Sequence, residues 1–181
     1  DYHLEIIDSF KDKLLSYQNL RFLIVGDFDC DGICSVSIIK RLLNQLNIQS
    51  NYYIPSRSKE GYGLSDSIIE MAIRHVFEVV LCVDNGIVAN EALHLAKKNG
   101  LKTLVIDHHE FESLPAVDAC LHPDLFPSQF KDMCASGICT LLANSFAYDE
   151  TSTVYGGLAT LADMVSVFGY NRCLLNQRID G

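Results

Sequence analysis

The stretch FLIVGDFDCDG, residues 22–32, decides the fold of this 181-residue chain. Four consecutive apolar residues come first, and three aspartates at every second position follow before Gly32. A short apolar run without alternation is typical of a strand buried on both faces, as in a parallel sheet between two layers of helices. Polar residues directly after such a strand lie at the carboxyl edge of the sheet, where α/β proteins bind their ligands.

Similar apolar runs alternate with segments of helical period along the chain. We expect strands at residues 22–25, 51–54, 79–83 and 103–106, and helices at 33–46, 65–75, 89–98, 135–147 and 154–165. Ser65 suits a helix N-cap, Asn99-Gly100 suits a helix end, and residues 110–132 read as mostly loop. The pattern predicts an α/β, doubly wound, mostly parallel sheet with helices on both faces, in a single domain over residues 1–181.

Charge and cysteine content limit the functional classes. A net charge of −9 argues against a sequence-independent binder of phosphate backbones, which normally shows clustered Lys and Arg. That objection weakens if many of the carboxylates bind divalent cations. Seven cysteines without a C-x-x-C pair favour a reducing compartment over a disulfide framework or a zinc knuckle.

No apolar run is long enough to cross a bilayer, and the first residues show no signal-peptide pattern. We therefore expect a soluble, cytoplasmic protein without membrane association. The chain does not start with Met, and we expect it to be a piece of a longer protein.

Acidic and imidazole side chains follow three of the expected strands. They are Asp27, Asp29 and Asp31 after the first strand, Asp84 after residues 79–83, and Asp107, His108 and His109 after residues 103–106. Five carboxylates at one rim repel unless a cation neutralises them. Mixed carboxylate and imidazole ligands favour Mn²⁺, with Mg²⁺ second. Because the ligands exceed what one octahedral ion needs, two ions placed for in-line attack on phosphorus are predicted.

Each of these residues also has a plainer interpretation. A single Asp at a strand end is often a helix cap or turn residue, and His108-His109 alone would suit a buried polar pair. Residues 27–32 are similar to the start of an EF-hand loop, but no Glu follows at the twelfth position. The plainer interpretations would all have to hold at the same end of one sheet.

Four motifs give the chain a family resemblance. Asp27-x-Asp29-x-Asp31-Gly32, Val83-Asp84-Asn85-Gly86, Ile106-Asp107-His108-His109 and Leu161-Ala162-Asp163 resemble the motifs of the DHH phosphoesterase superfamily. Residues 54–57, 60–64, 135–137, 159–165 and 171–172 resemble its RecJ branch, so the resemblance spans residues 22–172. It implies two-metal-dependent phosphodiester hydrolysis, as a 5′-to-3′ exonuclease on single-stranded DNA in DNA repair or recombination.

The resemblance also implies roles for individual residues. Asp31, Asp84, His108 and Asp163 would hold one metal ion, and Asp29 and Asp84 the other. Asp27 and Asp107 would support these ligands, since metal-bound imidazoles usually need an orienting partner. His109 would face the phosphate as a hydrogen-bond donor or proton carrier, which makes His109, Asp84 and Asp107 the expected catalytic residues.

Three further residues are candidates for phosphate binding. Arg57 can bind phosphate oxygens bidentately, although a solvated surface arginine explains it equally well. Ser136 and Gly137 could offer backbone N–H groups at a helix start, and a plain N-cap is the alternative.

The chain departs from the RecJ pattern at three positions and in length. Cys34 replaces a Thr, His122-Pro123-Asp124 replaces Asn-Pro-Asn, and Ser166 replaces a Pro. The downstream substrate-binding domains of the branch, one with a Gly-rich, His-containing motif and one an OB-fold, have no counterpart in this sequence. Single-stranded DNA is the expected partner, together with a single-strand-binding protein or helicase in the full-length protein.

Three alternatives stay open. The first is a small-substrate DHH enzyme, such as an oligoribonuclease, a cyclic dinucleotide phosphodiesterase or a pyrophosphatase, but these typically carry a His near the position of Val25. The second is a non-catalytic DHH scaffold, which would have lost ligands that are present here. A receiver domain would need a Lys after a late strand, and none is placed for it.

Overall fold

The computed structural model describes residues 4–56, 62–147 and 154–155 of the chain. The elements in chain order are α1 (Glu5–Ser16), β1 (Phe22–Val25), α2 (Cys30–Gln45), β2 (Ser50–Tyr53), α4 (Asp66–Arg74), β3 (Val79–Val83), α5 (Asn90–Lys98), β4 (Lys102–Ile106), β5 (Ala119–Leu121), η1 (Pro123–Leu125), η2 (Ser128–Phe130) and α6 (Ala135–Phe146).

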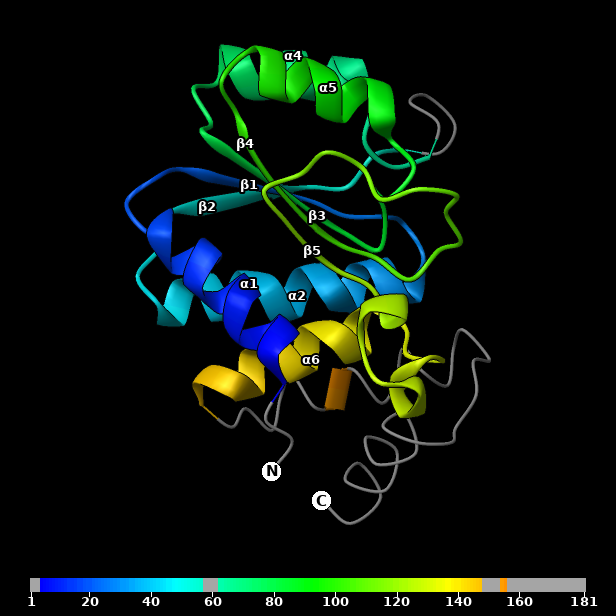
Figure 1. Cartoon of the computed structure of the whole chain (residues 1–181). Coiled ribbons are helices and arrows are strands. Elements are labelled where there is room, and N and C mark those ends of the chain that lie inside the picture. Colours follow the sequence, from blue (N-terminus) through cyan, green and yellow to red (C-terminus); the bar gives the residue numbers. More distant parts are fainter. Residues whose placement is uncertain (1–3, 57–61, 148–153, 156–181) are drawn as a thin grey trace.

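Five strands form one sheet in the order β2-β1-β3-β4-β5, and every pair in it is parallel. Helices α4 and α5 cover one face, while α1, α2 and α6 cover the other (Figure 1). The predicted α/β, doubly wound architecture is confirmed. The prediction of a single domain over residues 1–181 extends beyond the described residues and stays a prediction.

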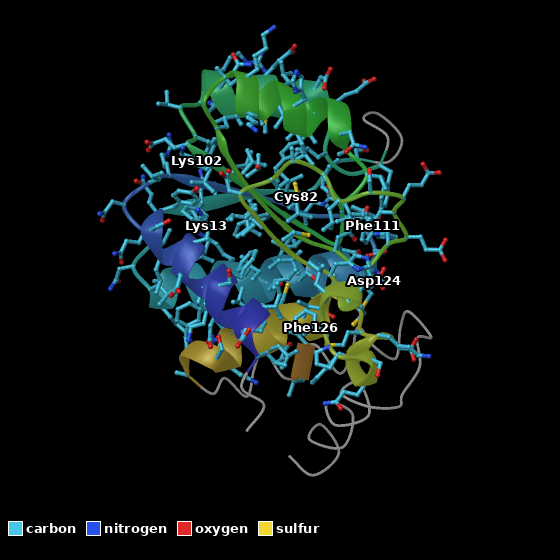
Figure 2. All side chains as sticks on the ribbon, in the orientation of Figure 1. Lys13, Cys82, Lys102, Phe111, Asp124 and Phe126 are labelled. Carbon is cyan, nitrogen blue, oxygen red and sulfur yellow. The ribbon has the colours of Figure 1, made fainter. Side chains whose placement is uncertain are left out.

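The sheet has a hydrophobic core on each of its faces, and alternate side chains of an apolar strand pack into the two cores. Phe22 and Ile24 of β1 face the core beneath α1, α2 and α6, whereas Leu23 and Val25 face the core beneath α4 and α5. Side chains fill the space on both faces of the sheet, with Cys82 among them (Figure 2). A strand buried on both sides needs no polar alternation, which explains the continuous apolar runs.

Most expected elements are found within a few residues of their predicted ends. Ser65 caps α4 by accepting a hydrogen bond from the Ile68 N–H at 3.4 Å, and Gly100 has the expected positive φ of 79°. Helix α2 begins three residues earlier than predicted, because Asp29 Oδ1 accepts the Gly32 N–H at 2.7 Å and caps the helix there. The helix expected at residues 154–165 lies almost entirely outside the described residues.

Four elements were not predicted, namely helix α1, strand β5 and the short 3-10 helices η1 and η2. Helix α1 buries Ile7, Phe10 and Leu14 against the sheet. Strand β5 lies within the segment expected to be mostly loop, where it pairs with β4 at the sheet edge. A three-residue strand is too short to show a hydrophobic period, so only its pairing with β4 identifies it.

Within the described ranges, no helix is both long and apolar enough to span a membrane. The six cysteines of this part of the chain are all free thiols, as expected from their number and spacing.

Candidate metal centre

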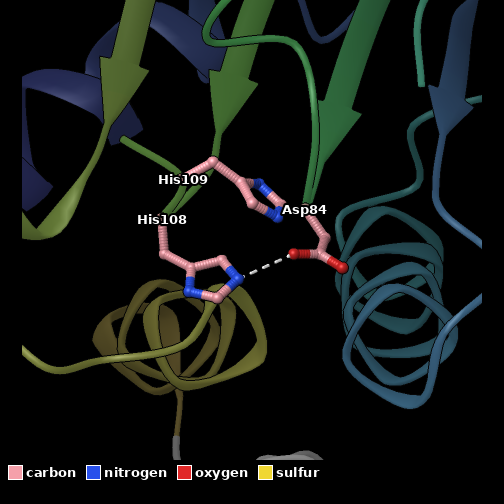
Figure 3. A group of neighbouring side chains, drawn as sticks. All are labelled: Asp84, His108 and His109. Atoms are coloured by element: carbon pink, nitrogen blue, oxygen red, sulfur yellow. Dashed lines mark ion pairs between the residues drawn. The ribbon is translucent and has the colours of Figure 1, made fainter. Parts of the chain in front are cut away.

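Three neighbouring strands end at one rim of the sheet. In the parallel register, Val25 of β1 lies beside Cys82 of β3, and Val83 lies beside Ile106 of β4. The residues that follow these strands therefore meet at the carboxyl edge, as the sequence predicted. Figure 3 shows Asp84, His108 and His109 converging just beyond the strand ends.

Asp84 lies at the centre of this rim. Its side chain is fully buried, and its backbone has the left-handed φ of 60°. Within the described residues neither carboxylate oxygen makes a hydrogen bond of good geometry, and the contact that is present is the ion pair between Oδ1 and His108 Nε2 at 3.0 Å (Figure 3). Burial, followed by the charges of Asp31 and Asp29, raises the Asp84 pKa from 3.8 to about 12. A buried carboxylate in this state is strongly disfavoured unless a cation binds it.

Two groups of metal-ligand atoms share this residue. Asp27, Asp29 and Asp84 form one group, and Asp84, His108 and His109 form the other. Within each group the ligand atoms all lie within 4.8 Å of one another. Oxygen and imidazole donors at this spacing fit divalent cations, and the shared Asp84 fits a bridge between two of them.

The first aspartate cluster is held by local backbone contacts. Asp27 Oδ1 accepts the Phe28 N–H at 2.8 Å, and Asp29 is the N-cap of α2. A side chain at Gly32 would place its Cβ only 2.2 Å from the Asp27 carbonyl oxygen, so this turn requires glycine. Asp27 lies within reach of Asp29 and Asp84 as a possible ligand, and the resemblance implied either a supporting role or weaker ligation for it.

Asp31 links the rim to α6. Its two carboxylate oxygens accept the backbone N–H groups of Ala135 at 3.1 Å and Ser136 at 2.9 Å, at the start of that helix. Its Oδ2 also lies 3.3 Å from His108 Nε2. Asp31 therefore both anchors a helix N-terminus, where negative charge is favoured, and contacts the proposed ligand His108.

Asp107 has the hydrogen bonds that Asp84 lacks. Its oxygens accept the backbone N–H groups of Ile87, His108 and His109, and Oδ1 lies 2.6 Å from His109 Nδ1. Burial opposes ionisation of Asp107, but the hydrogen bond and charge of His109 outweigh it and lower the Asp107 pKa. Asp107 thus orients His109 and the backbone around it, whereas the expected role was to orient metal-bound imidazoles, and that role stays a prediction.

The two histidines differ in electrostatic environment. The hydrogen bond to Asp107 raises the His109 pKa against the opposing effect of burial. Burial lowers the His108 pKa, in spite of the nearby Asp31 charge. A neutral His108 is suited to metal ligation, while His109 is suited to donating a proton or hydrogen bond.

Tyr62 and His122, which have no predicted role at the site, both contact His109. The Tyr62 hydroxyl lies 2.9 Å from His109 Nε2 and donates to the Asp84 carbonyl oxygen at 3.0 Å. His122 Nε2 donates to the His109 carbonyl oxygen at 2.7 Å, while its Nδ1 accepts the Asp124 N–H. The available signals were the position of Tyr62 between two glycines, within the RecJ-like residues 60–64, and the position of His122 in the segment that replaces Asn-Pro-Asn.

Asn85 holds three segments of the rim together. Its amide nitrogen donates to the carbonyl oxygens of Val25 and Val83, and its side-chain oxygen accepts the Leu64 N–H, each at 3.0 Å. A cavity of about 390 Å³ lies beside it, with Tyr62 and His109 in its wall. The cavity gives His109 access to a bound molecule.

Four predicted site residues remain, namely Arg57, Asp163, Ser136 and Gly137. Arg57 and Asp163 lie outside the described residues. Ser136 and Gly137 are buried, and the Ser136 N–H is already donated to Asp31. A phosphate at this helix start would have to compete with that carboxylate, and phosphate binding by Ser136 and Gly137 stays a prediction.

Comparison with known proteins identifies the family. The sequence model of the DHH family, N-terminal domain, matches residues 21–165. The chain belongs to the DHH family. Three of the four motifs that suggested this family supply side chains that meet at the rim, and the fourth, with Asp163, lies outside the described residues.

The relatives of this DHH chain are named as RecJ proteins. It is 32% identical over 164 residues to the single-stranded-DNA-specific exonuclease RecJ of Bacillus subtilis, covering 87% of this chain and 21% of that protein. It is 37% identical over 120 residues to RecJ of Haemophilus influenzae, covering 65% of this chain and again 21% of that protein. The chain thus spans about a fifth of the length of these relatives.

A crystal structure of exonuclease RecJ bound to manganese has the same fold. It matches with a TM-score of 0.86 at 24% identity, over 99% of this chain and 48% of that one. The structural similarity therefore extends over nearly the whole DHH chain.

Proposed function

We propose that this chain is the metal-dependent catalytic part of a phosphodiesterase that degrades single-stranded DNA from the 5′ end. The observation that carries the proposal is Asp84, a buried carboxylate without hydrogen-bond donors that two groups of ligands share. Burying such a group costs free energy unless a proton or a cation neutralises it. The relatives named as single-stranded-DNA-specific exonucleases supply the substrate class.

The proposed centre holds two ions, with Mn²⁺ preferred and Mg²⁺ second. Asp29, Asp31, Asp84 and His108 would hold them, with Asp27 adjacent and Asp163 as a further proposed ligand. Divalent ions there would activate a water molecule and neutralise the negative charge that develops on phosphorus. The structural neighbour bound to manganese supports the choice of metal.

The protein's own residues prepare the reaction. Asp107 holds the His109 ring through a 2.6 Å contact to Nδ1, so that Nε2 points toward Tyr62 and the adjoining cavity. A substrate that displaces the Tyr62 hydroxyl would receive a hydrogen bond from His109 Nε2. Because this histidine has a raised pKa, it can carry the proton that the leaving oxygen needs. Arg57 is proposed to bind a phosphate oxygen.

The biological setting is part of the same proposal. It places the protein in the cytoplasm, in DNA repair or recombination, with a single-strand-binding protein or helicase as partner, and the relatives named as single-stranded-DNA-specific exonucleases support the link to DNA. The chain itself would cut slowly, because an acidic chain retains a long anionic polymer weakly.

The test measures Mn²⁺-dependent hydrolysis by the chain at high concentration. The substrates are bis(4-nitrophenyl) phosphate and a 5′-phosphorylated single strand, and the second should release mononucleotides. Asp84→Asn should abolish both activities, whereas Asp12→Asn, an exposed charge change on α1, should leave them unchanged. Efficient cleavage of pyrophosphate or cyclic dinucleotides, with single-stranded DNA left intact by the longer protein, would favour a small-substrate enzyme instead.

A further inference from the structure

A second binding feature lies outside the metal rim, on the open edge of the sheet. Helix α2 and edge strand β2 enclose a groove of about 680 Å³. One end of this groove is formed by Ile33 and Ile54. Ile33 is two residues from Asp31 and Ile54 follows the carboxyl end of β2, so this end adjoins the rim. The groove then follows α2 away from the rim as far as Gln45.

The charge of the groove is opposite to that of the chain. Among the described residues that line it, Lys40 and Arg41 are basic and none is acidic, although the chain carries a net charge of −9. Lys40 Nζ donates to the carbonyl oxygen and to the hydroxyl of Ser50, at 2.6 and 2.9 Å. Both of these partners are neutral, so they fix the position of the ammonium group without cancelling its charge. The groove is therefore complementary to an anion.

Exposed apolar side chains lie next to these cations. Tyr52 on edge strand β2 is 58% exposed, and Ile33 on the first turn of α2 is 44% exposed. Asn44 and Gln45 add amide groups that can donate and accept hydrogen bonds. An aromatic ring beside fixed positive charge is the arrangement that binds single-stranded nucleic acid, because the ring stacks on a base while the cations contact phosphates.

We infer that this groove, here called the α2–β2 groove, binds a segment of single-stranded nucleic acid. The phosphate backbone would lie along Lys40 and Arg41, and one base would stack on Tyr52. The inference deepens the proposed function, since the bound segment would lie close to the metal rim. It also offsets the acidic balance of the chain, which by itself opposes DNA binding.

The experiment measures binding of a fluorescent twelve-nucleotide oligothymidylate by anisotropy, in low salt with EDTA so that no cleavage occurs. Arg41→Glu should weaken binding about tenfold or more, and Arg41→Ala should reduce the slope of log affinity against log salt by about one. The matched control is Arg74→Glu. It makes the same charge change on exposed Arg74 of α4, on the opposite face of the sheet, and should have a small effect.

The aromatic contact is tested separately. Tyr52→Ala should weaken binding at least about fivefold, while Tyr52→Phe should retain it because the stacking ring remains. Each variant must keep the wild-type rise in melting temperature on addition of Mn²⁺, which shows that the fold and the rim are intact.

Three outcomes would overturn the inference. In the first, Arg41→Glu and Arg74→Glu weaken binding equally, so that only net charge matters. In the second, Tyr52→Ala binds as tightly as Tyr52→Phe. In the third, the groove variants change self-association in sedimentation without changing oligonucleotide binding, which would assign the groove to protein contacts. Binding in EDTA does not depend on hydrolysis, so failure of the proposed activity is distinguishable from failure of the groove.

Discussion

Asp84 and Asp107 lie at equivalent positions at the end of the sheet, but their pKa values are shifted in opposite directions. Each is the first residue after one of two neighbouring parallel strands, and each is buried. Asp107 accepts four hydrogen bonds and its pKa is lowered, whereas Asp84 accepts none from the described residues and its pKa is raised to about 12. The protein thus provides hydrogen bonds for the Asp107 carboxylate, whereas the Asp84 carboxylate remains available to bind a cation.

The largest expected effect is the loss of metal binding on removal of the Asp84 charge. Asp84→Asn preserves the positive φ, which Asn tolerates, and removes the carboxylate that both ligand groups share. Calorimetric titration with Mn²⁺ should show no binding, and phosphodiester hydrolysis should fall on the order of a thousandfold. Mn²⁺ affinity equal to that of the wild type would show that the centre does not depend on Asp84.

Asp107→Asn should impair the orientation of His109 without impairing metal binding. The amide keeps the shape of the side chain but loses the charged partner of His109, so hydrolysis should fall by about 10- to 100-fold. Mn²⁺ affinity measured by calorimetry should stay within a few fold of the wild-type value. A loss of metal binding as complete as that of Asp84→Asn would remove the distinction between the two carboxylates.

The two substitutions should also shift the metal-free stability in opposite directions. Asp84→Asn removes a carboxyl group that must take up a proton to be buried without metal, so it should raise the melting temperature in EDTA by on the order of 5 °C. Asp107→Asn removes the charged acceptor of several hydrogen bonds and should lower it. Thermal unfolding followed by circular dichroism checks both, and shifts of the same sign would contradict the comparison.

The pH dependence follows from the sign of each pKa shift. Because the folded Asp84 pKa is above its ordinary value of 3.8, the folded state holds the extra proton, and metal-free stability falls as the pH rises between the two values. The advantage of Asp84→Asn over the wild type should therefore be larger at about pH 8 than at about pH 5.

Asp107 should behave in the opposite way. Its lowered folded pKa gives stability that is present above its ordinary value of 3.8 and is lost as the pH falls through the folded value. The cost of Asp107→Asn should therefore vanish in acid. Melting temperatures of the two variants and the wild type across a pH series provide the measurement.

The smallest effect is expected at Tyr62. Tyr62→Phe removes the hydroxyl that contacts His109 Nε2 and the Asp84 carbonyl oxygen but keeps the ring, so hydrolysis should change by about three- to fivefold. The Mn²⁺ affinity should not change. A large loss of Mn²⁺ affinity would show that Tyr62 supports the Asp84 backbone rather than His109.

The strands of the central sheet could be predicted because burial on both faces leaves a continuous apolar run in the sequence. The edge strand β5 and helix α1 were missed, the first because it spans only Ala119–Leu121. The rim was predictable for a geometric reason: parallel strands align their carboxyl ends, so residues after the runs at 22–25, 79–83 and 103–106 had to meet.

The sequence by itself determined which side chains gather at the rim, and the tertiary structure decided which of them carry an unbalanced charge. Asp107 receives a hydrogen bond from Ile87, 20 residues away, and Asp31 receives two from the start of α6, 104 and 105 residues away. A local sequence pattern cannot predict hydrogen-bond donors that are so far away along the chain. Whether a buried carboxylate is hydrogen-bonded depends on the packing of remote backbone, and that packing leaves Asp84 as the carboxylate that needs a cation.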